Sequence, residues 1–537
     1  MTVGSIRWAV WVVLAGFGVW ASPAFAGPPL GEKVDALIRS GGFETGHWGL
    51  LVVDSTTGRV VFERDADRLF CPASVAKLFS TAATLVDLGA DYRFKTPVVR
   101  RGELKGGVLR GDLILVGKGD LSLGGRTGHD GSLLFEDTDH SYAAANPDAS
   151  LVPCDPLAGL THLAREVHAG GITAITGDVL VDNRLFDRAP STGSGPTRVS
   201  AIVVNDNVVD VVVTPGSKPG EAAKVRIVPE TGAIQVDARV ETSAEGEPSV
   251  EVEAVAHCRI SVRGRVPVGH KPVLRVLEVD DPAGQARSLL IETLRNRGVR
   301  VGPSPLAEND AARLPSRTEV AGLPVVAEYT SPPLRESLKV LLKVSQNLHA
   351  STLPMLLAAK RGETSLARGL RVEGELLGQL GVDPRSASFG GGAGGSRSDL
   401  VTPRATVALL RAMAARPDFP AFDAALPILG RDGTLAKAVP PESLARGHAH
   451  AKTGTFWVEN GLDGRPILAS KALAGYLETA SGRRLTFAFF VNHVPIDAIG
   501  GTIPEAASLA GRRLGKLCEL FYLDATDPAE SPARPGR

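Results

Sequence analysis

The chain has 537 residues, of which 43% are apolar and 22% are charged, a composition typical of a globular protein with more than one core. Lysine plus arginine and aspartate plus glutamate both number 59. This balance argues against binding nucleic acid or an anionic membrane through overall charge, so a small or locally charged substrate fits better.

The first residues carry the pattern of a secretory leader. Arg7 precedes an apolar run from Trp8 to Trp20, and Ala24-Phe25-Ala26 supplies the small residues that signal peptidase recognises. Because the run is short and interrupted by glycine, a cleaved signal peptide over residues 1–26 is favoured over a retained anchor. We expect export to the periplasm as a soluble protein without a stable membrane anchor.

The cysteines and histidines suggest no bound metal. There are four cysteines, and export would permit a disulfide. Cys154 and Cys258 share one segment and are the favoured pair, although spacing alone does not choose among the pairings. No group of cysteine and histidine has the spacing of metal ligands, so we expect neither a metal nor another cofactor.

Helix and strand patterns at the two ends of the chain predict one shared α+β domain. Residues 48–54 and 59–63 form two expected strands, and a helix follows Pro72 and stops at Gly89. Near the other end, a second hairpin and a final helix are expected at residues 471–478, 484–492 and 505–521.

The middle of the chain has a different character. Four β-like runs, separated by turn signals, occupy residues 112–116, 177–182, 201–204 and 208–213. A helix over 281–297 follows them. We therefore expect a β-rich insert over 98–279, with the peptidase-type domain formed by 27–97 and 280–523 and a disordered tail over 524–537.

Ser74-Val75-Ala76-Lys77 places a hydroxyl and an amine on one face at the start of a helix. A serine hydroxyl is a poor nucleophile until a base removes its proton, and a desolvated lysine can act as that base. The pattern is weak on its own, because an ordinary solvated helix start would look the same.

Ser345-Gln346-Asn347 lies in a break between an apolar helix over 334–342 and another that begins near Leu348. Ser345 could relay a proton there and Asn347 could hold a substrate amide. Helix capping is the simpler alternative for these residue types.

Lys452-Thr453-Gly454-Thr455 leads into an expected strand. Lys452 can attract a carboxylate, the hydroxyls of Thr453 and Thr455 can bind it, and Gly454 permits close backbone approach. An edge strand protected by a lysine would give a similar sequence.

The three motifs follow one another in the order found in β-lactamases and penicillin-binding proteins, and this conjunction is specific. The chain resembles the D-alanyl-D-alanine carboxypeptidase/endopeptidase family, the class C low-molecular-mass penicillin-binding proteins. Beyond the first motif, the resemblance rests on residues 201–216, 401–404, 426–427, 432–435 and 451–455. It implies an α+β transpeptidase-like domain interrupted by two nested insert subdomains, acting on peptidoglycan stem peptides and cross-links and acylated by β-lactams.

The resemblance also implies residue roles. Ser74 would be acylated, Lys77 would be its base, and Ser345 and Asn347 would complete the proton path and the substrate clamp. Lys452, Thr453 and Thr455 would bind the terminal carboxylate, and the backbone N–H groups of Ser74 and Thr455 would form the oxyanion hole.

Three stretches depart from the family pattern. Gln346 replaces an acidic residue, residues 391–397 (GGAGGSR) lack the aspartate and first serine of the usual loop, and residues 459–470 are longer than usual. These changes bear on substrate preference and turnover.

A β-lactamase and a non-catalytic peptidoglycan-binding protein are the alternatives. Residues 78–344 separate Lys77 from Ser345, far more than a compact β-lactamase needs, and no glutamate-bearing deacylation motif is evident. The complete motif set argues against lost catalysis. Because the insert supplies none of the three motifs, we expect it to govern substrate access rather than bond cleavage. A spacer or stabilising lid is the alternative to a role in docking peptidoglycan.

Overall fold

The computed structural model describes residues 28–144, 146–256 and 258–524, besides Met1. Residues 2–26 of the predicted signal peptide and residues 525–537 of the predicted tail lie outside the described residues. No helix in the described part of the chain is both long enough and apolar enough to cross a bilayer.

The two ends of the chain meet in one antiparallel five-stranded sheet, in the order β19-β20-β21-β1-β2. Its strands are β1 (His47–Asp54), β2 (Val60–Arg64), β19 (Ala449–Glu459), β20 (Pro466–Glu478) and β21 (Arg484–Pro495). Both predicted hairpins are therefore confirmed, and β1 joins them by pairing with β21.

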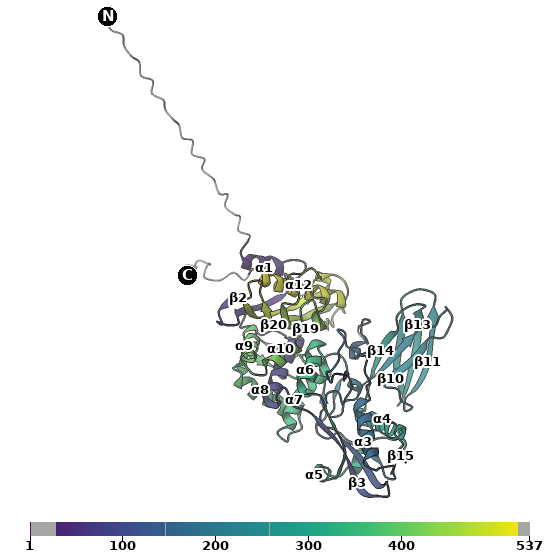
Figure 1. Cartoon of the computed structure of the whole chain (residues 1–537). Helices are drawn as coiled ribbons and strands as arrows, with labels where there is room; N and C mark the ends of the chain where they lie inside the picture. Colours follow the sequence, from purple (N-terminus) through teal and green to yellow (C-terminus); the bar gives the residue numbers. More distant parts are fainter. Residues whose placement is uncertain (2–27, 145, 257, 525–537) are drawn as a thin grey trace.

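Both faces of this sheet are covered, because successive strand residues point to opposite sides. Phe487 and Phe489 of β21 pack on one face with α1 (Leu30–Ile38) and α12 (Ile503–Asp524), while Phe490 packs on the other. Figure 1 shows α1 and α12 together beside the sheet. Two-sided burial explains why β21 is apolar along most of its length.

The second face carries a layer of helices. Helix α2 (Lys77–Leu88) follows a short 3₁₀ helix, η1 (Ala73–Ala76), and ends as predicted at Gly89, whose φ is 84°. The other helices with residues in this core are α6 (Leu334–Lys343), α7 (Asn347–Ala359), α8 (Leu366–Gln379), α9 (Pro403–Ala414) and α10 (Phe419–Ala425).

The insert begins with a mixed sheet covered by two helices. Its strands are β3 (Lys95–Lys105), β4 (Val108–Val116), β5 (Ala174–Ile175), β6 (Val179–Asp182), β15 (Arg300–Val301) and β16 (Val325–Thr330), with α3 (Ala158–Ala169) and α4 (Pro282–Asn296) against it. The boundary differs from the one expected at 279/280. Helix α4 buries Leu290 in the core of this sheet, and β16 pairs with β3.

A second unit of the insert is a small sandwich around a valine-rich core. It packs β9 (Val208–Thr214), β10 (Lys224–Val228) and β14 (Val273–Glu278) against β11 (Gln235–Ser243), β12 (Ser249–Ala256) and β13 (Arg259–Pro267). In Figure 1 these strands project away from the helical layer.

Two expectations for the insert are wrong. Residues 201–204 are buried but form no strand, because their backbone bonds to loops, as where Ala201 N–H donates to Asn183 Oδ1 at 2.8 Å. All four cysteines are free. Cys154 precedes α3, whereas Cys258 lies in the turn between β12 and β13, so the two belong to different units of the insert.

Candidate active site

The segment that carries Ser74 is fixed to the central sheet. The Cys71 N–H donates to Asn492 Oδ1 at 2.8 Å, and the Cys71 carbonyl accepts from Ser470 Oγ at 2.7 Å. Ala73 has a φ of 45°, an unusual backbone conformation for a residue with a side chain. This anchored turn leaves Ser74 half-buried.

Lys77 lies directly behind that hydroxyl and is fully buried. Its Nζ donates to Ser74 Oγ at 2.8 Å, to Asn347 Oδ1 at 2.7 Å and to the Ala393 carbonyl at 2.7 Å. Burial lowers the pKa of Lys77 to about 7, and the charge of Asp399 acts in the opposite direction. The amine can therefore be neutral at ordinary pH while it contacts the hydroxyl.

The second motif meets the first through Asn347. Asn347 begins α7, and its Nδ2 donates to the carbonyl of Ser194 in the insert at 2.8 Å. Ser345 adopts a φ of 64° between α6 and α7. Within the residues described by the structure, the Ser345 hydroxyl makes no hydrogen bond, so its predicted role as a proton relay stays a prediction.

The third motif lies on β19, next to η1. A Cβ added to Gly454 would lie 2.5 Å from the Pro72 carbonyl, so glycine is what lets the strand approach the nucleophile segment. The hydroxyl of Thr453 donates to Thr434 Oγ1 at 2.7 Å, and that of Thr455 accepts from Lys471 Nζ at 2.8 Å. These contacts fix the orientation of both hydroxyls.

Lys452 is wholly buried and donates to the Thr453 carbonyl at 2.9 Å. Burial lowers its pKa well below the usual range, and the positive charges of Lys77 and Lys471 lower it further. Burial also lowers the pKa of Lys471, to about 8. The site thus holds three lysines that resist being charged together, which favours an anionic ligand.

A glycine-rich loop contacts Lys77 through the Ala393 carbonyl. The sequence did not lead us to predict Asp399, the residue that holds this loop together. Asp399 accepts the N–H groups of Gly390 at 2.7 Å and Ser396 at 2.8 Å. It supplies a carboxylate two residues beyond the GGAGGSR stretch, which lacks the family's aspartate. Burial raises the pKa of Asp399 to about 6, against the effect of these hydrogen bonds.

Gly394 in this loop has a φ of 84°, and an added Cβ would lie 1.9 Å from the Ala73 carbonyl. Gly394→Ala should therefore displace the loop and its carbonyl contact to Lys77, lowering stability by about 2 kcal/mol or more and slowing acylation. Thermal melting and the rate of penicillin labelling measure both effects.

Gly374→Ala is the matched control, because nothing lies within 4 Å of its added Cβ in the interior of α8. It should be neutral or slightly stabilising. Equal behaviour of the two variants would show that the loop does not need glycine at 394.

The insert also reaches the site, although it supplies none of the three motifs. Besides Ser194, Tyr142 contacts the second motif, since its hydroxyl donates to the Ser345 carbonyl at 2.8 Å. Neither residue belongs to a catalytic motif, so the sequence carried no signal for either contact.

Comparison with known proteins agrees with this geometry. Residues 30–506 match the D-Ala-D-Ala carboxypeptidase 3 (S13) family. A D-alanyl-D-alanine carboxypeptidase of Actinomadura sp. (strain R39) is 31% identical over 83% of this chain and 80% of its own length. A D-alanyl-D-alanine carboxypeptidase of Haemophilus influenzae is 23% identical over 83% of this chain and 85% of its own length.

Among solved structures, penicillin binding protein 4 from Haemophilus influenzae aligns with a TM-score of 0.65 and 20% identity, covering 91% of this chain and 99% of the other. That likeness confirms the predicted fold class, an α+β penicillin-binding domain with additional domains. The family match confirms the predicted class of enzyme. From residue 30 to residue 506, the chain belongs to the D-Ala-D-Ala carboxypeptidase 3 (S13) family.

Proposed function

We propose that this protein cleaves peptidoglycan peptides that end in D-Ala-D-Ala, through an acyl-enzyme on Ser74. The observation that carries the proposal is the 2.8 Å contact between Ser74 Oγ and the buried Lys77 Nζ. A lysine with a pKa of about 7 is a competent base for a serine hydroxyl at neutral pH.

In the acylation step, neutral Lys77 accepts the Ser74 proton while Oγ attacks the carbonyl carbon of the penultimate D-Ala. The peptide C–N bond breaks, and the leaving D-Ala amine takes a proton delivered from Lys77, for which the Ser345 hydroxyl is the proposed relay. Water then hydrolyses the ester and releases the shortened peptide. The N–H groups of Ser74 and Thr455 are the proposed oxyanion donors, supported by the close approach at Gly454.

Recognition of the terminal carboxylate is proposed for Lys452, Thr453 and Thr455. Because burial and nearby positive charges depress the pKa of Lys452, a bound carboxylate would stabilise its protonated form. A protonated Lys452 would in turn disfavour a charge on Lys77. Substrate binding would then help to keep the base neutral.

We therefore expect a peptide ending in D-Ala-D-Ala carboxylate to be cleaved about 100-fold faster than the same peptide as a C-terminal amide. Release of D-Ala or D-Ala amide, measured by chromatography, checks this. A peptide ending in D-Ala-L-Ala controls for nonspecific peptidase activity. Equal cleavage of acid and amide would contradict the role of Lys452.

The proposal extends to the cell wall as the site of action. The apolar run that begins at Trp8 supports export, and we propose the periplasm as the compartment. Incubating the protein with monomeric and cross-linked muropeptides, and with fluorescent penicillin, tests the proposal as a whole. Formation of a covalent penicillin adduct and loss of D-Ala would support it, and failure of both would overturn it.

A further inference from the structure

Tyr142 bridges the two ends of the second motif. Its hydroxyl donates to the Ser345 carbonyl at 2.8 Å and accepts from the Asn347 N–H at 3.0 Å. Tyr142 ends a short 3₁₀ helix of the insert, η2 (His140–Tyr142). One hydroxyl from the insert therefore satisfies a carbonyl and an amide that lie on either side of Gln346.

The second motif needs such support because its backbone is unusual. Ser345 has a φ of 64°, in a region that residues with side chains rarely adopt and that persists only where surroundings enforce it. Asn347 is the first residue of α7, where backbone N–H groups have no partner within the helix. The Tyr142 hydroxyl supplies one partner, and Gln346 Oε1 supplies another by accepting from Leu348 N–H at 2.9 Å.

Gln346 connects the same loop to η2 a second time. Its Nε2 donates to Ser141 Oγ at 3.0 Å, and Ser141 Oγ donates in turn to Asp139 Oδ1 at 2.5 Å. An acidic residue at 346, as the family pattern has it, would place a second carboxylate against Asp139. The side-chain amide of Gln346 can donate a hydrogen bond to the insert where a carboxylate could not.

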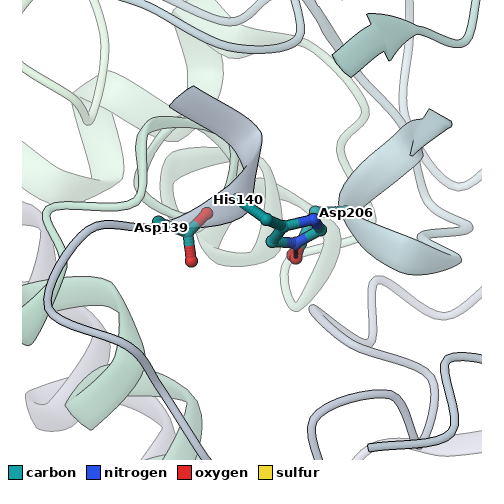
Figure 2. Close-up of side chains that lie close together, drawn as sticks. All are labelled: Asp139, His140 and Asp206. Atoms are coloured by element: carbon teal, nitrogen blue, oxygen red, sulfur yellow. Dashed lines mark hydrogen bonds and ion pairs between the residues drawn. The ribbon is translucent and has the colours of Figure 1, made fainter. Parts of the chain in front are cut away.

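A buried network of charges fixes η2. Arg126 contacts Asp139 and Asp206, both at 2.6 Å, and His140 lies between Asp206 and Asp210, both at 2.8 Å. His349 of α7 joins through Asp206 at 2.7 Å, so the network returns to the helix that carries Asn347. Figure 2 shows Asp139, His140 and Asp206 side by side.

The ligand atoms of Asp139, His140 and Asp206 lie within 4.8 Å of one another, close enough for a metal ion. Their chemistry fits an ion network better. Burial opposes a charge on His140, yet the carboxylates of Asp210 and Asp206 raise its pKa to about 10, so both ring nitrogens carry protons. Arg126 already forms ion pairs with two of the carboxylates.

We propose that Tyr142 is a positioning residue for acylation, whose hydroxyl holds the second motif so that Asn347 Oδ1 meets Lys77 Nζ. This inference rests on the proposed function of Ser74 and Lys77. The Asn347 side chain is shared between Lys77 and the insert, at 2.7 Å and 2.8 Å, so a shift of the loop moves a direct partner of the base. Displacements of about 1 Å can cost a catalytic site about 100-fold in rate.

The test is Tyr142→Phe, which removes only the hydroxyl. We expect the rate constant for acylation by penicillin to fall about 10- to 100-fold, while the affinity of the complex before acylation changes little. Hydrogen exchange should accelerate at the Asn347 amide, whose acceptor is lost. This second readout does not depend on activity.

Tyr476→Phe is the matched control. The Tyr476 hydroxyl donates to the Leu410 carbonyl at 2.7 Å, in the peptidase domain, and in the described part of the chain it has no hydrogen bond to any of the three motifs. Tyr476→Phe should lose about as much stability as Tyr142→Phe. Its acylation rate and the hydrogen exchange of its Asn347 amide should stay at the wild-type values. If Tyr142→Phe is acylated by penicillin as fast as Tyr476→Phe, or if the Asn347 amide stays protected from hydrogen exchange, the inference is overturned.

A second variant covers the case in which Tyr142→Phe fails to fold. Gln346→Glu keeps the shape of the side chain but faces Asp139, so we expect a folded protein with at least tenfold slower acylation. If penicillin acylates Gln346→Glu at the wild-type rate, the inference is overturned in that case. Absence of any adduct in the unmodified protein would instead overturn the proposed function.

Discussion

Replacing Ser74 by alanine is expected to abolish covalent labelling by fluorescent penicillin and to reduce release of D-Ala by about 10⁴-fold or more. The hydroxyl is the only group of this side chain that contacts Lys77 Nζ, and the variant removes it while leaving the backbone of η1 in place. Gel fluorescence and the mass of the intact protein after incubation with penicillin measure the result.

Ser40→Ala is the control, because the Ser40 hydroxyl is exposed and its contacts are with Leu37 of its own segment and with Arg513. It should label at the wild-type rate. Mass spectrometry of the digested adduct should place the penicilloyl group on the peptide that contains Ser74. An adduct that persists in Ser74→Ala would mean that another residue is the nucleophile.

Replacing Lys77 by methionine is expected to lower the acylation rate about 1,000-fold, since general base catalysis typically contributes 10²- to 10⁴-fold. Stability should be retained or rise, because the variant removes an amine whose charged form is disfavoured by burial. Stopped-flow labelling and thermal melting give the two quantities. Lys437→Met, at a side chain that is 89% exposed, serves as the control.

The same residue predicts the pH dependence of the unmodified enzyme. Only neutral Lys77 can accept the proton, so the acylation rate should rise with pH and reach half its maximum near the pKa of about 7. Labelling rates between pH 5.5 and 8.5 measure this limb. A flat profile would show that another group is the base.

Local patterns sufficed to predict the parts of the fold that depend on neighbouring residues. The helix after Pro72, its stop at Gly89 and both hairpins of the central sheet follow from spacing and turn chemistry, and all are present. The contact between Lys77 and Asn347 joins residues 270 positions apart. It was predictable only because the motifs occur together in a known order.

Other features depend on tertiary contacts that no local pattern encodes. Residues 201–204 read as a strand because they are apolar, yet they are buried without a strand partner. Asp399 accepts from backbone groups of its own loop, but that loop meets Lys77 only through the tertiary fold. Tyr142 contacts a backbone carbonyl 203 positions away. Helix α4 was assigned to the wrong side of a boundary because amphipathic spacing does not reveal which core a helix covers.

The insert leaves and re-enters the peptidase domain at one point, because Lys95 and Thr330 are register partners of β3 and β16. Next to them, Phe94 and Ser331 exchange backbone and side-chain hydrogen bonds, both at 2.9 Å. A unit with adjacent ends could be gained or lost in evolution as one piece, without rethreading the chain. Loss of the insert would, however, remove the hydrogen bonds that Tyr142 and Ser194 make with the second motif. A lineage that discarded the insert could keep the fold, but it would need other residues to hold Ser345 and Asn347.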